Sequence, residues 1–409
     1  MLFDKTRLYL KMPSRHRAFT LLLFISLVPI SLFFVGACAN IVGFGFLNQY
    51  SEYILLGLFS LASLSRLKRY ICGSDVLLYI AFVLVLFLSP MVYPQSQEFI
   101  QDNGVKFAFS VVPFYLIGLA VDYEDLRENF KWIARWGVIL QVTFQLLCLA
   151  GYVNTYNNNS DLAREQMVFA YGFLFSAMYI TKLAFEEQNI MDAILSVVSL
   201  FLLFSMGTRG PVVIYLIFLL GMAIVFVKYK RHNLLKKSIV LAILAIVYFY
   251  LSPILLGMSI FASSIGLSTR VFDSFLGSEM FDASSSSGRD EIFDKIKLAI
   301  DNDSSGFGYG FGGDRLFTDV YAHNFEAEIL VSFGIIGGSI ILCLLLWLTV
   351  KAFWIARKSS SLSFLFLLFC YSIVGLQFSG TWIEKPALFL YIGFCVALIR
   401  KSRIKAKNL

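Results

Sequence analysis

The feature that most constrains this chain is a succession of long apolar runs joined by short charged segments. A helix needs about 20 apolar residues to cross the hydrocarbon layer of a bilayer. The runs that approach this length are Ala18–Ala37, Ser51–Leu67, Val76–Val92, Val105–Val121, Trp132–Tyr152, Met167–Leu183, Ile190–Met206, Pro211–Val227, Ser238–Leu256, Ala327–Val350, Leu362–Ser379 and Ala387–Ile399. The sequence therefore predicts an all-α integral membrane protein with about twelve transmembrane helices.

Composition excludes the other broad classes of protein. Of the 409 residues, 58% are hydrophobic and 15% are charged, whereas soluble proteins carry about 25% charged residues. A soluble fold of this length could not hide so much apolar surface. A soluble enzyme, a disordered chain, a fibrous protein and a secreted disulfide scaffold are thereby excluded. The six cysteines lack metal-ligand spacing, and we expect no metal, cofactor or nucleic-acid partner.

The basic residues predict an orientation. With the N-terminus placed in the cytoplasm, 25 of the 34 Lys and Arg residues fall in inner segments and 9 in outer ones. Cytoplasmic loops collect Lys and Arg, so both termini are expected in the cytoplasm. The predicted organisation is nine helices in residues 1–256, a large outer loop at 257–324, and three helices with a basic tail at 325–409.

The large outer loop holds ten acidic and five basic residues and has internal pattern. Ser287-Gly288-Arg289-Asp290 is typical of a capped helix start, and the apolar residues that follow are helically spaced. We expect a short amphipathic helix that packs on the bundle or lies in the membrane interface. Gly308-x-Gly310-x-x-Gly313 matches a dinucleotide pattern, but it follows no strand and predicts only a turn.

One histidine on the outer face is a candidate proton acceptor. His323 lies where the loop meets the tenth apolar run, and a histidine can accept a proton near neutral pH. Glu326 follows three residues later, so on a helix it could orient His323. The alternatives are a histidine that caps a helix and an acid that complements the helix dipole.

Outer arginines are candidate anion ligands. Arg209 lies in a tight hairpin between two apolar runs, where a charge is costly and usually functional. Arg289 opens the loop helix, and Arg270 and Arg315 are weaker candidates. The alternatives are snorkelling to lipid headgroups and plain solvation. Cations and one base at lipid depth suit a lipid diphosphate leaving group and an attacking hydroxyl.

The order of these motifs resembles a known family. Thr208-Arg209-Gly210 is followed by Ser287-Gly288-Arg289, Gly308-Tyr309-Gly310, Ala322-His323-Asn324 and Glu328-Ile329-Leu330-Val331-Ser332-Phe333-Gly334-Ile335-Ile336-Gly337. This order resembles the O-antigen ligase and O-antigen polymerase superfamily of bacterial inner membranes. The motif-bearing resemblance covers residues 205–338.

The resemblance implies a metal-independent glycosyltransferase with a fold like the integral-membrane (GT-C) class. Such enzymes move a glycan from undecaprenyl diphosphate to an acceptor hydroxyl on the periplasmic face. The family's catalytic positions fall on His323, Arg289 and Arg209, which we expect to share one pocket. The predicted substrate-binding residues are Asn324, Arg270, Arg315 and Glu326.

The resemblance does not determine which molecule accepts the glycan. The compact loop between Arg289 and His323 favours a polymerase, which extends a lipid-linked repeat, over a ligase, which transfers to lipid A-core. The expected partners are the lipid-linked oligosaccharide, membrane lipid and a chain-length regulator. A lipid-linked oligosaccharide transporter is the alternative from another class, and the scarcity of charge within the apolar runs disfavours it.

Overall fold

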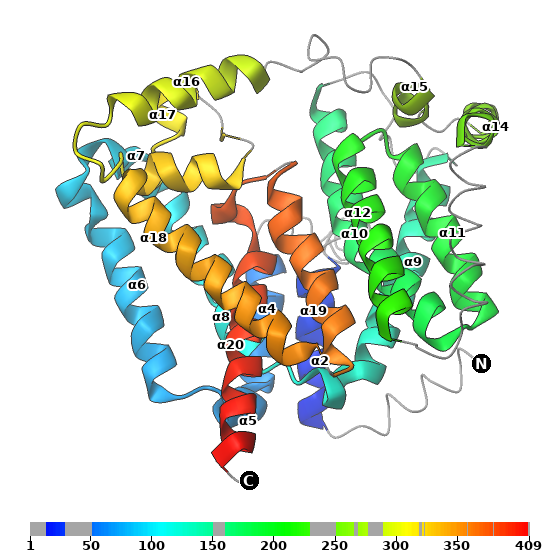
Figure 1. The fold of residues 1–409 in the computed structure, drawn as a ribbon, viewed down its shortest axis with the longest axis horizontal. Helices are drawn as coiled ribbons and strands as arrows, with labels where there is room; N and C mark the ends of the chain where they lie inside the picture. Colours follow the sequence, from blue (N-terminus) through cyan, green and yellow to red (C-terminus); the bar gives the residue numbers. More distant parts are fainter. Residues whose placement is uncertain are drawn as a thin grey trace. The chain divides into compact units, whose positions relative to one another are not determined.

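The computed structural model describes most of the chain. The described residues are 14–28, 51–149, 160–229, 251–265, 269–276, 289–318, 321–322, 324–357, 359–378 and 380–407. Within these ranges every regular element is a helix (Figure 1). The predicted all-α class is therefore confirmed for the described part of the chain.

The chain divides into two compact units. Unit 1 comprises residues 1–59 and 127–285, and unit 2 comprises residues 60–126 and 286–409. The helices that lie wholly or mainly in unit 1 are α2 (Ser14–Leu27), α4 (Ser51–Ala62), α9 (Tyr123–Leu149), α10 (Ser160–Glu187), α11 (Ile190–Ser205), α12 (Arg209–Tyr229), α14 (Leu251–Ser264) and α15 (Arg270–Leu276). The first residues of α9 and the last residues of α4 belong to unit 2.

Unit 2 combines long helices with several short ones. Its α-helices are α5 (Leu64–Tyr70), α6 (Gly73–Val92), α7 (Gln97–Phe99), α8 (Phe114–Leu119), α16 (Arg289–Asn302), α17 (Arg315–Thr318), α18 (Phe325–Ala356), α19 (Ser361–Phe369) and α20 (Pro386–Lys407). Its 3-10 and π segments are η2 (Pro94–Ser96), η3 (Ile100–Gly104), η4 (Phe107–Val111), η7 (Cys370–Val374) and η8 (Trp382–Glu384).

Two helices, α6 and α18, are long and apolar enough to cross a membrane among the residues described. Six shorter apolar helices accompany them, in the regions of α2, η4–α8, α11, α12, α14 and α19–η7. Large apolar side chains on α6 and α18 are exposed, including Leu77, Met91 and Leu346. Exposed apolar surface of this extent is typical of contact with lipid, so the helices indicate membrane association.

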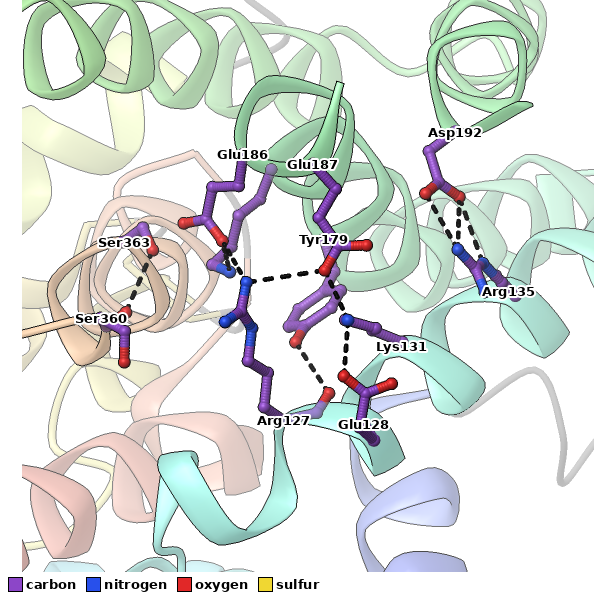
Figure 2. A network of polar contacts seen from close by, with 11 residues as sticks. Arg127, Glu128, Lys131, Arg135, Tyr179, Glu186, Glu187, Asp192, Ser360 and Ser363 are labelled. Carbon is purple, nitrogen blue, oxygen red and sulfur yellow. Dashed lines mark hydrogen bonds and ion pairs between the residues drawn. The ribbon is translucent and has the colours of Figure 1, made fainter. Parts of the chain in front are cut away.

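Unit 1 contains a polar network that joins α9 to α10 and α11, which Figure 2 shows at close range. Arg135 of α9 forms a bidentate ion pair with the fully buried Asp192 of α11, at 2.9 to 3.1 Å. Lys131 contacts Glu128 and, on α10, Glu187 at 2.6 and 2.5 Å. Charges that leave water must be paired, and these pairs fix the helix ends against one another.

In unit 2, α20 packs closely along α8. A Cβ atom on Gly118 would lie 2.3 Å from the carbonyl oxygen of Leu390, and one on Gly393 would lie 2.1 Å from that of Tyr115. Glycine at both positions therefore lets the two backbones approach. At the C-terminal end of α20, Arg400 donates to both carboxylate oxygens of Asp75 at 2.7 and 2.6 Å.

The predicted outer loop is largely helical where it is described. Helix α14 runs on to Ser264, and α15, α16 and α17 follow it. The amphipathic helix predicted after Ser287-Gly288 is confirmed as α16, which begins at Arg289. Its Ile296 and Ala299 are buried together with Ala322 and with Val331 of α18, so α16 packs back on unit 2 (Figure 1).

Helix α18 is interrupted, and the glycine-rich turn fills the interruption. Gly334 has φ 70° and ψ 176° inside the helix. The N–H groups of Tyr309 and Gly310 donate to the carbonyl oxygens of Val331 and Ser332 at 3.0 and 2.9 Å, and the Ile336 N–H donates to the Gly306 oxygen at 3.0 Å. The turn thus supplies hydrogen-bond partners for the backbone groups that the break in α18 would leave unpaired.

Candidate functional site

The site is built around the start of α18. Ala322-His323-Asn324 and the motif that begins at Glu328 lie here in the sequence, and Gly308-Tyr309-Gly310 precedes them. Asn324 is the N-cap of the helix, and its side-chain oxygen accepts a hydrogen bond from the Ala327 N–H at 2.9 Å. A capping side chain of this kind stabilises a helix by about 1 kcal/mol. The cap fixes Asn324, which directly follows the predicted base His323 in the sequence.

A side chain that the sequence did not single out joins two predicted residues. The Asn324 amide donates to Gln377 Oε1 at 3.2 Å, and Gln377 Nε2 donates to Glu326 Oε1 at 2.8 Å. Gln377 lies just after the π-helical segment η7, more than 50 residues away in the sequence. The structure therefore brings Asn324 and Glu326 together, through a glutamine whose role carries no local sequence signal.

Asp314 is a second residue that motif reasoning missed. Its side chain is fully buried, and its Oδ2 atom accepts a hydrogen bond from the Ala322 N–H at 2.9 Å. Burial raises the pKa of Asp314, while the Ala322 N–H and the Arg315 guanidinium oppose that rise. Asp314 immediately precedes the short helix α17, so its side chain links the start of this helix to Ala322, the residue before His323.

Glu328, on the first turns of α18, is also buried. The Thr381 hydroxyl donates to its Oε1 atom, and the Trp382 N–H donates to its Oε2 atom at 3.3 Å. In the sequence, Glu328 is only the first residue of the motif that ends at Gly337. In the structure it links α18 to the segment that leads into α20, a long-range contact that spacing cannot reveal.

The predicted substrate residue Arg315 is half-buried and lies over an aromatic ring. Its guanidinium carbon lies 4.7 Å from the centre of the Phe99 ring, a cation–π arrangement. Its Nε atom is buried without a hydrogen-bond partner among the described residues. Glu326, by contrast, has an exposed side chain.

The remaining predicted arginines share one structural position. Arg209, Arg270 and Arg289 are the first residues of α12, α15 and α16, respectively. The Arg209 side chain is exposed and follows Gly207, whose φ of 73° allows the sharp turn before α12. A helix N-terminus repels cations and attracts anions, so an arginine there costs helix stability. The first turn of α12 holds no acid, whereas acids follow the arginine in the first turns of α15 and α16.

The predicted site is only partly described. His323 lies outside the described residues, although Ala322 and Asn324 on either side are within them. Arg209 belongs to unit 1, whereas Arg289 and Arg315 belong to unit 2, and each is placed within its own unit. The structure brings together Asn324 and Glu326 through Gln377.

Among the described residues, no group of His, Cys, Asp and Glu side chains could hold a metal ion. The described polar side chains at the site are the capping Asn324, Gln377, the exposed Glu326, the two buried acids and Arg315. Comparisons with protein-family models, curated proteins and solved structures return no match for this chain.

Proposed function

We propose that this protein is a membrane glycosyltransferase of the O-antigen polymerase type. In this proposal it transfers a glycan from undecaprenyl diphosphate to a hydroxyl of a second lipid-linked repeat. The reaction takes place at the periplasmic face of a bacterial inner membrane, and both termini are cytoplasmic. The proposed fold has about twelve transmembrane helices and resembles the integral-membrane (GT-C) class of glycosyltransferases.

The observation that carries the proposal is the placement of two arginines at helix starts. Arg209 opens α12 and Arg289 opens α16, helices of 21 and 14 residues. Selection for stability alone would place acids at these positions. The N-terminal end of a helix attracts anions, and an exposed guanidinium such as that of Arg209 binds phosphate oxygens, which supports a diphosphate as the bound group.

The chemistry assigned to each residue follows from charge. As the glycosidic bond to the diphosphate breaks, negative charge grows on the leaving phosphate oxygens, and Arg209 and Arg289 stabilise that charge. His323 accepts the proton of the attacking acceptor hydroxyl. Asn324, Glu326, Arg270 and Arg315 are proposed to contact the substrate.

Complementation of a polymerase-deficient strain, read on a lipopolysaccharide gel, tests the proposal. We expect His323→Ala and Arg289→Ala to abolish the ladder of long chains while the protein remains in the membrane. The matched controls are His232→Ala, in a predicted cytoplasmic segment, and Lys297→Ala, an exposed cation on α16. Wild-type ladders from His323→Ala and Arg289→Ala would refute the assigned chemistry.

The same gel separates polymerase from ligase. Loss of a polymerase leaves lipid A-core carrying a single repeat. Loss of a ligase leaves core alone, while lipid-linked polymer accumulates. Lipid A-core without any repeat in the His323→Ala strain would therefore replace the polymerase assignment with the ligase. Retention of all lipid-linked repeats on the cytoplasmic side of the membrane would indicate the transporter.

A further inference from the structure

The part of α18 that follows its break has the length of a membrane span. It runs from Gly334 to Ala356, and a helix of that length rises about 33 Å. The hydrocarbon layer of a bilayer is about 30 Å thick. The first charged residue after Glu328 in the sequence is Lys351. With Gly334 at one surface of the membrane, the last turns of α18 therefore reach the lipid headgroups of the opposite surface.

These last turns carry two exposed tryptophans. Trp347 and Trp354 are 53% and 63% exposed. Lys351 lies four residues after the first and three before the second, a spacing that puts the three side chains on one face of the helix. We call Trp347, Lys351, Trp354 and Arg357 the tryptophan–cation face of α18. Tryptophan is typical of the zone where a transmembrane helix meets the headgroups.

Each of the two tryptophan rings has a cation beside it. The Cζ atom of Arg357 lies 3.6 Å from the centre of the Trp354 ring, and the Nζ atom of Lys351 lies 5.9 Å from the centre of the Trp347 ring. An aromatic face attracts a cation electrostatically. A guanidinium stacked on a ring presents the N–H donors along its edge, which is the geometry that binds phosphate oxygens.

The chain supplies little counter-charge at this face. Neither Lys351 nor Arg357 forms an ion pair with a described acid, and no Asp or Glu lies between Glu328 and Glu384 in the sequence. Glu124 accepts a hydrogen bond from the hydroxyl of Ser360, just beyond the helix.

The cations near the end of α20 are different. Arg400 and Lys401 are paired with Asp75 and Asp122, at 2.6 and 2.9 Å. The tryptophan–cation face therefore carries positive charge that an anion from outside this part of the chain can balance.

We propose that the tryptophan–cation face of α18 binds an anionic phospholipid. The lipid phosphate accepts hydrogen bonds from Arg357 and Lys351, and the acyl chains lie along the exposed Leu346 and Val350, which are nearer the middle of the helix. A zwitterionic lipid binds less well, because its headgroup brings a cation of its own. This binding requires no transferase activity, so it stands or falls separately from the proposed function.

Quenching of tryptophan fluorescence by brominated lipid tests the site in the full-length protein. The protein is reconstituted in phosphatidylcholine vesicles, and an equal small share of the lipid is replaced by phosphatidylglycerol or by phosphatidylcholine with dibrominated chains. We expect phosphatidylglycerol to bind about fivefold or more tightly than phosphatidylcholine, and so to quench more strongly. Equal quenching by the two brominated lipids would overturn the proposal.

A pair of double variants with the same change in charge tests the role of the cations. Lys351→Gln with Arg357→Gln keeps both tryptophans, and the preference for phosphatidylglycerol should disappear. Lys401→Gln with Arg403→Gln removes the same charge from exposed positions on α20, and the preference should remain. A preference that persists in the first variant, or that is lost equally in both, would overturn the proposal.

A third variant locates the lipid. Trp347→Phe with Trp354→Phe keeps the cations but leaves only Trp132, Trp136 and Trp382, none of which is exposed. The difference in quenching between the two brominated lipids should then disappear, and a difference that remains would place the anionic lipid elsewhere. Weak quenching of the wild-type protein by both lipids would show that protein, such as a second copy of the chain, covers the face. Either of these results would overturn the proposal.

Discussion

Arg209 occupies a position that is electrostatically unfavourable for its own helix. Its exposed guanidinium stands at the first position of α12, where the partial positive charge of the helix end repels it. Gly207, two residues before it, turns the chain with a φ of 73°. In the proposed function, the diphosphate of the substrate is the anion that balances this arginine at the positive end of the helix.

The geometry of the cation, and not only its charge, is expected to matter at Arg209. Lysine in its place offers a point charge without the planar fork that binds two phosphate oxygens. We expect Arg209→Lys to lower the yield of long chains on the gel by about tenfold. Arg403→Lys, an exposed position near the C-terminal end of α20, should leave the ladder unchanged. Equal ladders from both variants would count against bidentate binding.

The burial of Asp314 makes the stability of the folded protein sensitive to pH. Burial raises its pKa, so the folded state holds its proton more tightly than the unfolded state does. Stability from this group is therefore complete below its unfolded pKa of about 3.9 and declines as pH rises through the raised folded pKa. The charged groups that face it are Glu328 of α18 and Arg315 of α17.

The expected result is a free energy of unfolding that falls as pH rises from about 4 through the raised folded pKa of Asp314. Asp314→Asn should reduce this pH dependence, because the amide does not titrate. The measurement is denaturant unfolding in detergent at successive pH values in both proteins. An Asp314-dependent part of the stability that increases with pH would contradict the assigned direction.

At the scale of elements, α18 depends on a contact with the glycine-rich turn, which lies outside the helix in the sequence. A Cβ atom on Gly334 would lie 2.1 Å from the Gly306 oxygen, and the residue adopts a φ of 70° that favours glycine. The hydrogen bonds from the glycine turn then bridge the break. Helix and turn are therefore one structural unit, and either one alone would leave backbone groups without partners.

Gly334→Ala should destabilise the protein by about 3 kcal/mol or more, since backbone strain and a backbone clash add together. Gly380→Ala is the control, because Gly380 has φ 90° but nothing within 4 Å of its added Cβ atom. That variant should cost about 1 to 2 kcal/mol, the strain alone. Denaturant unfolding in detergent measures both variants, and equal losses would show that the contact with the turn adds nothing.

At the scale of the whole molecule, the orientation in the membrane is open to direct test. In a background without the six native cysteines, Ser304→Cys places a thiol in the exposed turn after α16, and Arg403→Cys places one near the end of α20. A thiol reagent that cannot cross the inner membrane should label position 304 in cells with a permeable outer membrane. Position 403 should be labelled only after the inner membrane is opened. The reverse pattern would invert the predicted orientation.

The sequence by itself determined the helical class and the existence of α16. Apolar runs of span length leave the backbone no other way to satisfy its hydrogen bonds in lipid, so helices were predictable wherever the structure describes those runs. Helix α16 was equally predictable, because Ser287-Gly288 and the spacing of Ile292 and Ile296 are local signals.

Only the tertiary structure decided what surrounds the start of α18. Gln377 bonds Asn324 across 53 positions, Thr381 bonds Glu328 across the same separation, and the glycine turn docks into the break at Gly334. Such contacts follow from how helices pack, and a single sequence carries no local trace of them. Periodicity reports which face of a helix is apolar, whereas the partner of a buried polar group depends on elements that are distant in the chain.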